Sequence, residues 1–192
     1  IITIDDIVDV IEDENTEDFE KMALLQPSDD EYLKTNVFTL YKNRIVWLLI
    51  LMVSATFTGQ IIEGFEDKLA AIAGLTAAIP MLMDTGGNCG NQVSTLVIRG
   101  LALGDIKISD YFKVLWKEIR VALLCGVTLA TVNFGRMWLL KVITGSDVQN
   151  STFIIVCLAM MCAVVVAKSI GCSLPMLAKL LHLDPALMAG PM

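Results

Sequence analysis

Long apolar runs alternate with short polar segments along most of this chain. An uncharged run covers residues 45–62, and further apolar stretches cover about 69–103, 121–143 and 152–175. A helix that crosses the roughly 30 Å hydrocarbon core of a bilayer needs about 20 apolar residues. Each stretch is long enough for a crossing with its flanking residues. The pattern predicts an all-α, polytopic membrane helix bundle with four transmembrane spans.

The second apolar stretch is interrupted by the polar sequence GGNCGNQ, at residues 86–92. The stretch is longer than one straight crossing needs, and its glycines disfavour an uninterrupted helix. Irregular backbone inside a membrane survives only where it is buried in protein or lines water. We therefore expect the second span to break at GGNCGNQ and to offer backbone carbonyls to a polar pathway. A packing device, in which glycines let two helices approach closely, is the alternative.

The first part of the chain differs from the rest in charge. Residues 1–31 hold twelve acids against one base, Lys21, whereas the chain as a whole has a net charge of −7. Residues 1–14 predict a short strand and then an amphipathic helix, capped by Asp5 or Asp6. Residues 15–43 predict an acidic, partly helical connection to a transmembrane pore domain at 44–192. So acidic a tail argues against nucleic acid as a partner, because binding it requires neutralised phosphates.

The distribution of bases predicts a topology. Lysine and arginine gather in the N-terminal flank, in a predicted loop at 104–120 and in the segment 168–182. The other two loops, 63–68 and 144–150, contain a single base, Lys68. The positive-inside rule then places both termini in the cytoplasm. We expect a multi-pass protein of the plasma membrane with the lipid bilayer as its surroundings.

Three polar residues near the expected break form the first candidate site. Asp84, Asn88 and Asn91 are spaced four and three apart, so they share one face wherever helix persists. Carboxylate and amide oxygens are the ligands of hard cations, and Mg²⁺ gives up its water reluctantly. A path for hydrated Mg²⁺ would use such oxygens, together with a backbone carbonyl at Gly87. These residues are the first candidate metal site.

Two further acidic features are candidates for a role with cations. Asp184 precedes Pro185, which is typical of a helix start, and Asp184 is either a plain N-cap or a carboxylate at a pore mouth. Acids recur at helical spacing in the tail, Asp9 and Asp13 among them. They form either a solvated helix face or a divalent-cation sensor that gates the pathway.

The chain shows no pattern that is typical of an enzyme. It contains no phosphate-binding glycine loop, no dinucleotide fingerprint, and a single histidine, His182. An intramembrane aspartyl protease would need Asp84 and Asp184 to share a proton, and its usual GxGD-type motif is absent. That class stays open beside a non-transporting membrane scaffold, in which the amides only pack helices.

Several motifs resemble one known family. The pattern P-x5-GGN-x-G-x-Q from Pro80 to Gln92, then LVIRGLALGDI at 96–106, WKE at 116–118 and LDPALMAGP at 183–191, is similar to MgtE-type magnesium channels and their eukaryotic solute-carrier relatives. Residues 1–14 resemble the last strand and helix of a CBS domain. The resemblance covers the whole chain.

The resemblance carries its own expectations. It implies a homodimer with a pore on the two-fold axis, lined by the second and fifth helices, with Asn88, Asn91 and Asp184 in or near the path. It also implies that cytoplasmic Mg²⁺ gates the passage of hydrated Mg²⁺ down its electrochemical gradient, so that Mg²⁺ is both transported and regulatory. The fifth span of the family is then missing from this chain. A Mg²⁺ exporter of the same fold, coupled to another ion, is the alternative.

Overall fold

The computed structural model describes residues 3–23, 25, 33–72, 74–145 and 148–189, and these residues form helices joined by short turns. The result confirms the predicted all-α helix bundle. The elements are α1 (Ile4–Met22), α2 (Val37–Gly64), α3 (Glu66–Ala70), α4 (Leu75–Ala102), η1 (Ile108–Asp110), α5 (Tyr111–Thr144), α6 (Asn150–Leu180) and η2 (Pro185–Ala189).

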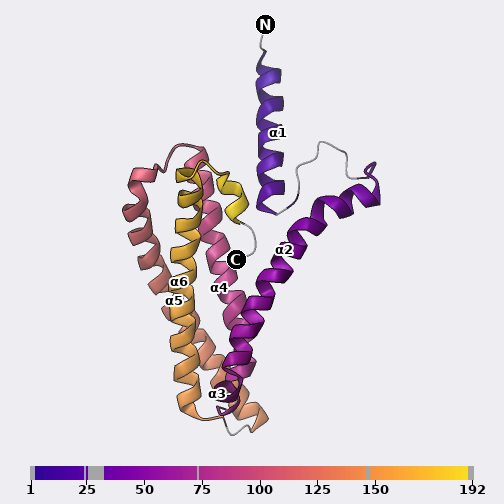
Figure 1. The fold of residues 1–192 in the computed structure, drawn as a ribbon. Coiled ribbons are helices and arrows are strands. Elements are labelled where there is room, and N and C mark those ends of the chain that lie inside the picture. Colours follow the sequence, from indigo (N-terminus) through magenta and orange to yellow (C-terminus); the bar gives the residue numbers. More distant parts are fainter. Residues whose placement is uncertain (1–2, 24, 26–32, 73, 146–147, 190–192) are drawn as a thin grey trace.

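The long helices run alternately up and down (Figure 1). Helix α2 descends, α4 rises, α5 descends and α6 rises, with α3 at the lower end and η2 at the upper end. Helix α1, the turn between α4 and η1, and η2 all lie at the upper end. The ends of α2 and α5, which lie in the predicted base-poor loops, therefore fall at the opposite end from the basic segments.

Three helices of the described part are long and apolar enough to cross a membrane: α2, α5 together with η1, and α6. Helix α4 is as long as α2, at 28 residues, but its amides and glycines make it less apolar. Helix α2 buries none of its residues and diverges from the others (Figure 1). Helices α4, α5 and α6 form the packed bundle.

Helix α6 is the centre of that bundle and packs against α4 and α5. Its contact with α4 depends on two glycines: a Cβ atom added at Gly171 would lie 2.5 Å from the carbonyl oxygen of Gly90. Around this contact Val93, Val97 and Cys172 form an apolar core. Small residues allow helices in a membrane to approach until their backbones touch.

The predicted break in the second span is wrong, because residues 86–92 lie inside the continuous helix α4. A helix satisfies its own backbone hydrogen bonds, and packing against α6 offsets the conformational cost of the glycines. The chain turns instead between α3 and α4, where Gly74 has a φ of 83°. Gly90 instead lets α4 and α6 approach closely, which was the alternative interpretation of the glycines.

Two other local predictions are also wrong. Residues 108–120 are helical, so the basic loop predicted at 104–120 shrinks to the turn before η1. The N-cap of α1 is Thr3, whose hydroxyl accepts from the Asp6 amide while Asp6 accepts from the Thr3 amide. Of the predicted N-terminal strand, residues 1–2 lie outside the described part, and helix begins at Ile4 and runs past residue 14.

A buried ion pair joins α5 to α6. The Lys168 ammonium lies 4.0 Å from the Glu118 carboxylate, and the two side chains are only 6% and 15% exposed. Lys168 therefore lies inside the bundle, although the sequence places it in a basic terminal segment. Glu118 can contact Lys168 because it belongs to the continuous helix α5 and not to the predicted loop.

Candidate ion pathway

A polar stripe follows one side of α4. At about 3.6 residues per turn, Asp84, Asn88, Asn91, Thr95 and Arg99 fall along a single line of the helix surface. Gly90, Val93 and Val97, which are buried residues of α4, fall on the opposite side, where α4 packs against α6. The structure therefore confirms that Asp84, Asn88 and Asn91 share a face, and it adds two residues to that face.

The stripe offers side-chain oxygens to its surroundings. Asp84 and Asn88 are exposed, and Asn91 is half-buried. The backbone carbonyls at Gly87 belong to the helix interior, so the carbonyl ligand expected there from a broken helix is absent from this arrangement. Any ion on this face would meet carboxylate, amide and hydroxyl groups, which are suitable partners for a hard cation or its water shell.

Asp184 lies at the upper end of the bundle, where it caps η2, one of the two roles expected for it. Its Oδ1 atom accepts a hydrogen bond of 2.9 Å from the amide of Ala186, at the start of η2. The short helix is held to α4 by Ser94, whose hydroxyl donates to the carbonyl of Met188 at 3.1 Å. The Asp184 carboxylate is thereby fixed beside the upper end of α4.

The other oxygen of Asp184 pairs with α1. Lys21 lies 2.6 Å from Asp184 and 2.6 Å from Glu17 in its own helix. Although burial alone would raise the pKa of Asp184, the hydrogen bonds from Lys21 and the Ala186 amide lower it overall. The hydrogen bonds to Asp184 and Glu17 raise the pKa of Lys21. The sequence does not signal the contact between Lys21 and Asp184, because the two residues are 163 positions apart.

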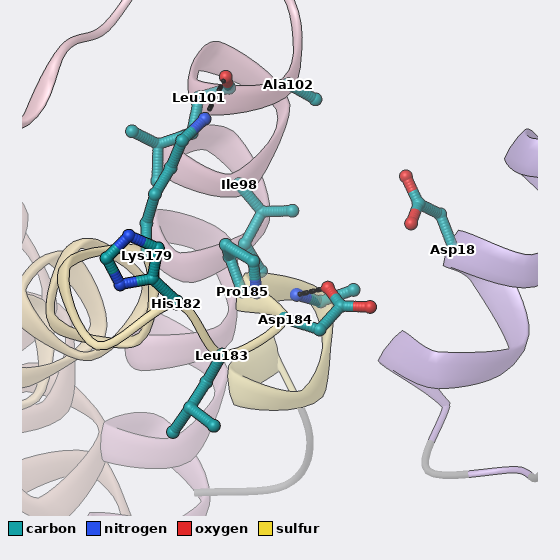
Figure 2. A pocket seen from close by; sticks show the side chains of 10 residues that line it. Asp18, Ile98, Leu101, Ala102, Lys179, His182, Leu183, Asp184 and Pro185 are labelled. Atoms are coloured by element: carbon teal, nitrogen blue, oxygen red, sulfur yellow. Dashed lines mark hydrogen bonds between the residues drawn. The ribbon is translucent and has the colours of Figure 1, made fainter.

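A cavity of about 490 Å³ lies between α1, η2 and the upper ends of α4 and α6. Asp18 and Asp184 lie on opposite sides of it (Figure 2). Burial, and then the charge of Asp184, raise the pKa of Asp18. Lys179 lines the same cavity and donates a hydrogen bond of 2.9 Å to the carbonyl of Leu101.

A second cavity, of about 540 Å³, separates α1 from the polar stripe itself. It is lined by Asn15, Asp18 and Phe19 from α1, and by Thr95 and Arg99 from α4. Helix α1 therefore stands directly over the upper end of the stripe. The sequence does not predict this juxtaposition, because α1 and α4 lie far apart in the chain.

One predicted grouping is not brought together. Asp184 adjoins Ile98 and Ala102, at least 14 residues along α4 from Asp84, which is roughly 20 Å at the helical rise. The two aspartates cannot share a proton, so the protease interpretation fails. Asp9 and Asp13 are exposed on α1. Within the described residues, no group of three His, Cys, Asp or Glu side chains is placed to hold a metal ion.

Arg136 is the arginine of the apolar stretch at 121–143, and its side chain reaches α4. The guanidinium donates to the Asn133 side chain at 2.8 and 3.1 Å, and its Nη2 lies 3.3 Å from the sulfur of Met81. Met81 lies one turn before Asp84 on the same side of α4. An arginine in an otherwise apolar span was the signal that could have identified it.

The fold and this site define a polytopic helical membrane protein whose fourth helix carries a continuous polar face. The family model described as "MgtE: Divalent cation transporter" matches residues 79–192. The chain belongs to the MgtE family of divalent cation transporters.

Three relatives match the chain over its entire length. Proteins named "Magnesium transporter MgtE" from Thermus thermophilus, Enterococcus faecalis and Bacillus subtilis are 36%, 31% and 29% identical to it. The chain spans 41%, 40% and 41% of their respective lengths. The aligned part includes α1 and α2 as well as the bundle.

Proposed function

We propose that this chain is part of a transporter that passes hydrated Mg²⁺ across the plasma membrane along the polar stripe of α4. One observation carries the proposal: the stripe lies opposite the face that packs on α6, although it is part of a helix in a membrane bundle. Polar and ionisable groups are costly against lipid and mark polar pathways when they persist there. The three magnesium transporters among the relatives support the choice of ion.

The chemistry of the stripe suits an ion that keeps its water. Asp84 contributes the charge, and the side chains of Asn88 and Asn91 contribute amide groups that bind water as donors and acceptors. Mg²⁺ usually retains several waters and binds proteins through one or two carboxylates. Gly87 is proposed to keep the stripe accessible by its lack of a side chain rather than to supply a carbonyl.

A stripe on one helix forms only one wall of a path. We propose that a second copy of the protein closes the pathway as a homodimer, with α4 facing the shared axis. The basic upper end of the bundle would face the cytoplasm by the positive-inside rule, which places α1 there as well. Residues 1–14 would be the end of a regulatory CBS domain, and 15–43 its connection to the pore domain.

Helix α1 is proposed to gate the pathway in response to cytoplasmic Mg²⁺. It stands over Thr95 and Arg99 at the upper end of the stripe, and the Lys21–Asp184 pair holds it there. Acids such as Asp9 and Asp13 would repel one another unless a divalent cation neutralises them. Bound cytoplasmic Mg²⁺ would then favour the position of α1 seen in this structure and would slow transport.

Uptake of Mg²⁺ into liposomes tests the proposal. We expect the full-length protein to carry Mg²⁺ down an imposed gradient, and Asn88→Ala to reduce the rate or alter selectivity. Asn88 is exposed, so the substitution should change the free energy of unfolding by less than about 0.5 kcal/mol. Leu96→Ala is the matched control, because Leu96 is an exposed apolar residue of α4 outside the stripe.

The possible outcomes separate the competing functions. Unchanged flux in Asn88→Ala would remove the stripe from the path and favour a packing role for the amides. Absence of flux in the wild-type protein under any Mg²⁺ gradient would refute the proposed function. Transport that requires a second ion gradient would instead support the coupled exporter.

A further inference from the structure

Arg136 places a fixed positive charge beside the polar stripe. Its guanidinium donates two hydrogen bonds to one Asn133 oxygen, and Asn133 is itself only 4% exposed between helices. A guanidinium stays ionised in proteins and presents its donors in a rigid plane. The buried amide therefore holds the charge in one place, with its Nη2 atom against Met81 of α4.

The direction of the side chain shows that this charge stays inside the membrane region. Arg136 lies eight residues before the end of α5, which is about 12 Å from that end of the helix. An arginine near a helix end usually extends toward the nearer interface. Arg136 instead bonds the residue three positions earlier, so its guanidinium points toward the middle of α5.

The partners in the structure do not balance the charge. Asn133 and Met81 are neutral, and among the described residues no carboxylate forms an ion pair with Arg136. Asp84 is a negative charge that is likewise unbalanced. Its side chain is exposed, and it forms no ion pair with any of the described residues. An unpaired charge at this depth usually faces a partner or a cavity.

The two charges lie within reach of each other. Met81 and Asp84 are three residues apart on α4, so their Cβ atoms are about 5–6 Å apart on one face. A guanidinium that touches Met81 needs only a rotation of its long side chain to approach the Asp84 carboxylate. In this structure the guanidinium is hydrogen-bonded to Asn133 instead.

We propose that Arg136 is the counter-charge of Asp84 and sets the affinity of the pathway for divalent cations. This inference rests on the proposed function, since it assigns a charge balance to the proposed path. With Arg136 in place the Asp84 level has no net charge, so it attracts Mg²⁺ only moderately and releases it readily. Loss of the arginine makes this level more negative, and loss of the carboxylate makes it more positive.

The test measures the half-saturating Mg²⁺ concentration for flux in liposomes that contain the full-length protein. We expect Arg136→Gln to lower this concentration by about fivefold, the effect of one elementary charge on a nearby divalent ion in a water-lined path. Asp84→Asn should raise it by a similar factor. The double variant should return to within about twofold of wild type, because it restores the net charge.

Two further variants distinguish a charge effect from a structural effect. Arg136→Lys keeps the charge and should stay near the wild-type concentration even where the maximal rate falls. Lys141→Gln removes a cation from the same helix, but Lys141 bonds Val148 and Asn150 at the lower turn. This control should leave the half-saturating concentration unchanged.

Three results would overturn the inference. These are an unchanged concentration in Arg136→Gln, equal shifts in Arg136→Gln and Lys141→Gln, or a double variant that stays as far from the wild-type concentration as either single variant. Each of these results can be measured only if the wild-type protein transports Mg²⁺. They are therefore distinct from a failure of the proposed function, in which the wild-type protein carries no Mg²⁺. If Arg136→Gln alone does not fold, the comparison of Asp84→Asn with the double variant still decides the question, because removal of the arginine should bring the raised concentration back to near the wild-type value.

Discussion

The two long-range lysine–carboxylate pairs of the described structure lie in contrasting surroundings. Lys168 and Glu118 join α6 to α5 inside the bundle, with side chains 6% and 15% exposed and 4.0 Å between charged atoms. Lys21 and Asp184 join α1 to η2 at the upper end, with side chains 22% and 34% exposed and 2.6 Å between them. The closer pair is the one that water reaches.

The comparison teaches that distance alone does not measure what a pair contributes. A buried charge that loses its partner keeps the full cost of its desolvation, whereas water replaces the partner of an exposed one. The interior pair is therefore expensive to break, and the pair at the upper end can open and close. In the proposed function, a rigid bundle with a helix docked over its polar stripe is the arrangement that a gated pathway needs.

The largest expected effect is at the interior pair. Lys168→Met leaves Glu118 buried without a counter-charge, and we expect it to lower the free energy of unfolding by about 3–5 kcal/mol. The double variant Glu118→Gln/Lys168→Met should recover most of that loss. Thermal unfolding in detergent measures both. Equal losses in the single and double variants would show that the charges are not coupled.

The glycine contact of the same interior should give the next largest effect. Gly171→Val places a Cβ atom 2.5 Å from the Gly90 carbonyl oxygen, and we expect a loss of about 1–3 kcal/mol as α4 and α6 move apart. Gly135→Ala is the matched control, because nothing lies within 4 Å of its new atom, and it should be neutral or stabilising. The same thermal unfolding assay applies. A tolerated Gly171→Val would contradict the close contact of the two helices.

The smallest effect is expected at the upper end, and it depends on pH. Asp184 has a lowered pKa, so its contribution to holding α1 is present above the ordinary value of 3.8 and is lost as pH falls below it. Lys21 has a raised pKa, so its contribution is present below 10.5 and is lost at more alkaline pH. Because both groups are partly exposed, we expect about 1 kcal/mol or less.

Amide hydrogen exchange in α1 measures this contribution. Protection should be greatest between those two pH values after correction for intrinsic exchange, and Lys21→Met should abolish the dependence. Asp18 has a raised pKa through burial and the charge of Asp184. Asp18→Asn should therefore increase protection at neutral pH, since it removes a charge that opposes docking. A dependence on pH that survives Lys21→Met would assign the docking of α1 to other groups.

The wrong prediction of a broken helix has a specific cause. Three glycines and three amides within GGNCGNQ suggested that backbone carbonyls become free, yet the cost of glycine in a helix is only about 1 kcal/mol each. Packing of α4 against α6 through Gly90 and Gly171 offsets that cost. The spacing of Asp84, Asn88 and Asn91, in contrast, led to a correct prediction. This spacing places the three residues on one face because the helix continues through them.

The sequence by itself determined the helical class, the location of the apolar helices and the shared face of Asp84, Asn88 and Asn91. These properties depend on local spacing and on the cost of exposing peptide groups to lipid, which neighbouring residues decide. Only the tertiary structure decided that α6 lies between α4 and α5, that Lys168 meets Glu118, that Lys21 meets Asp184 and that Arg136 reaches Met81. Such contacts join residues far apart in the chain, and they follow from how helices pack rather than from any local pattern.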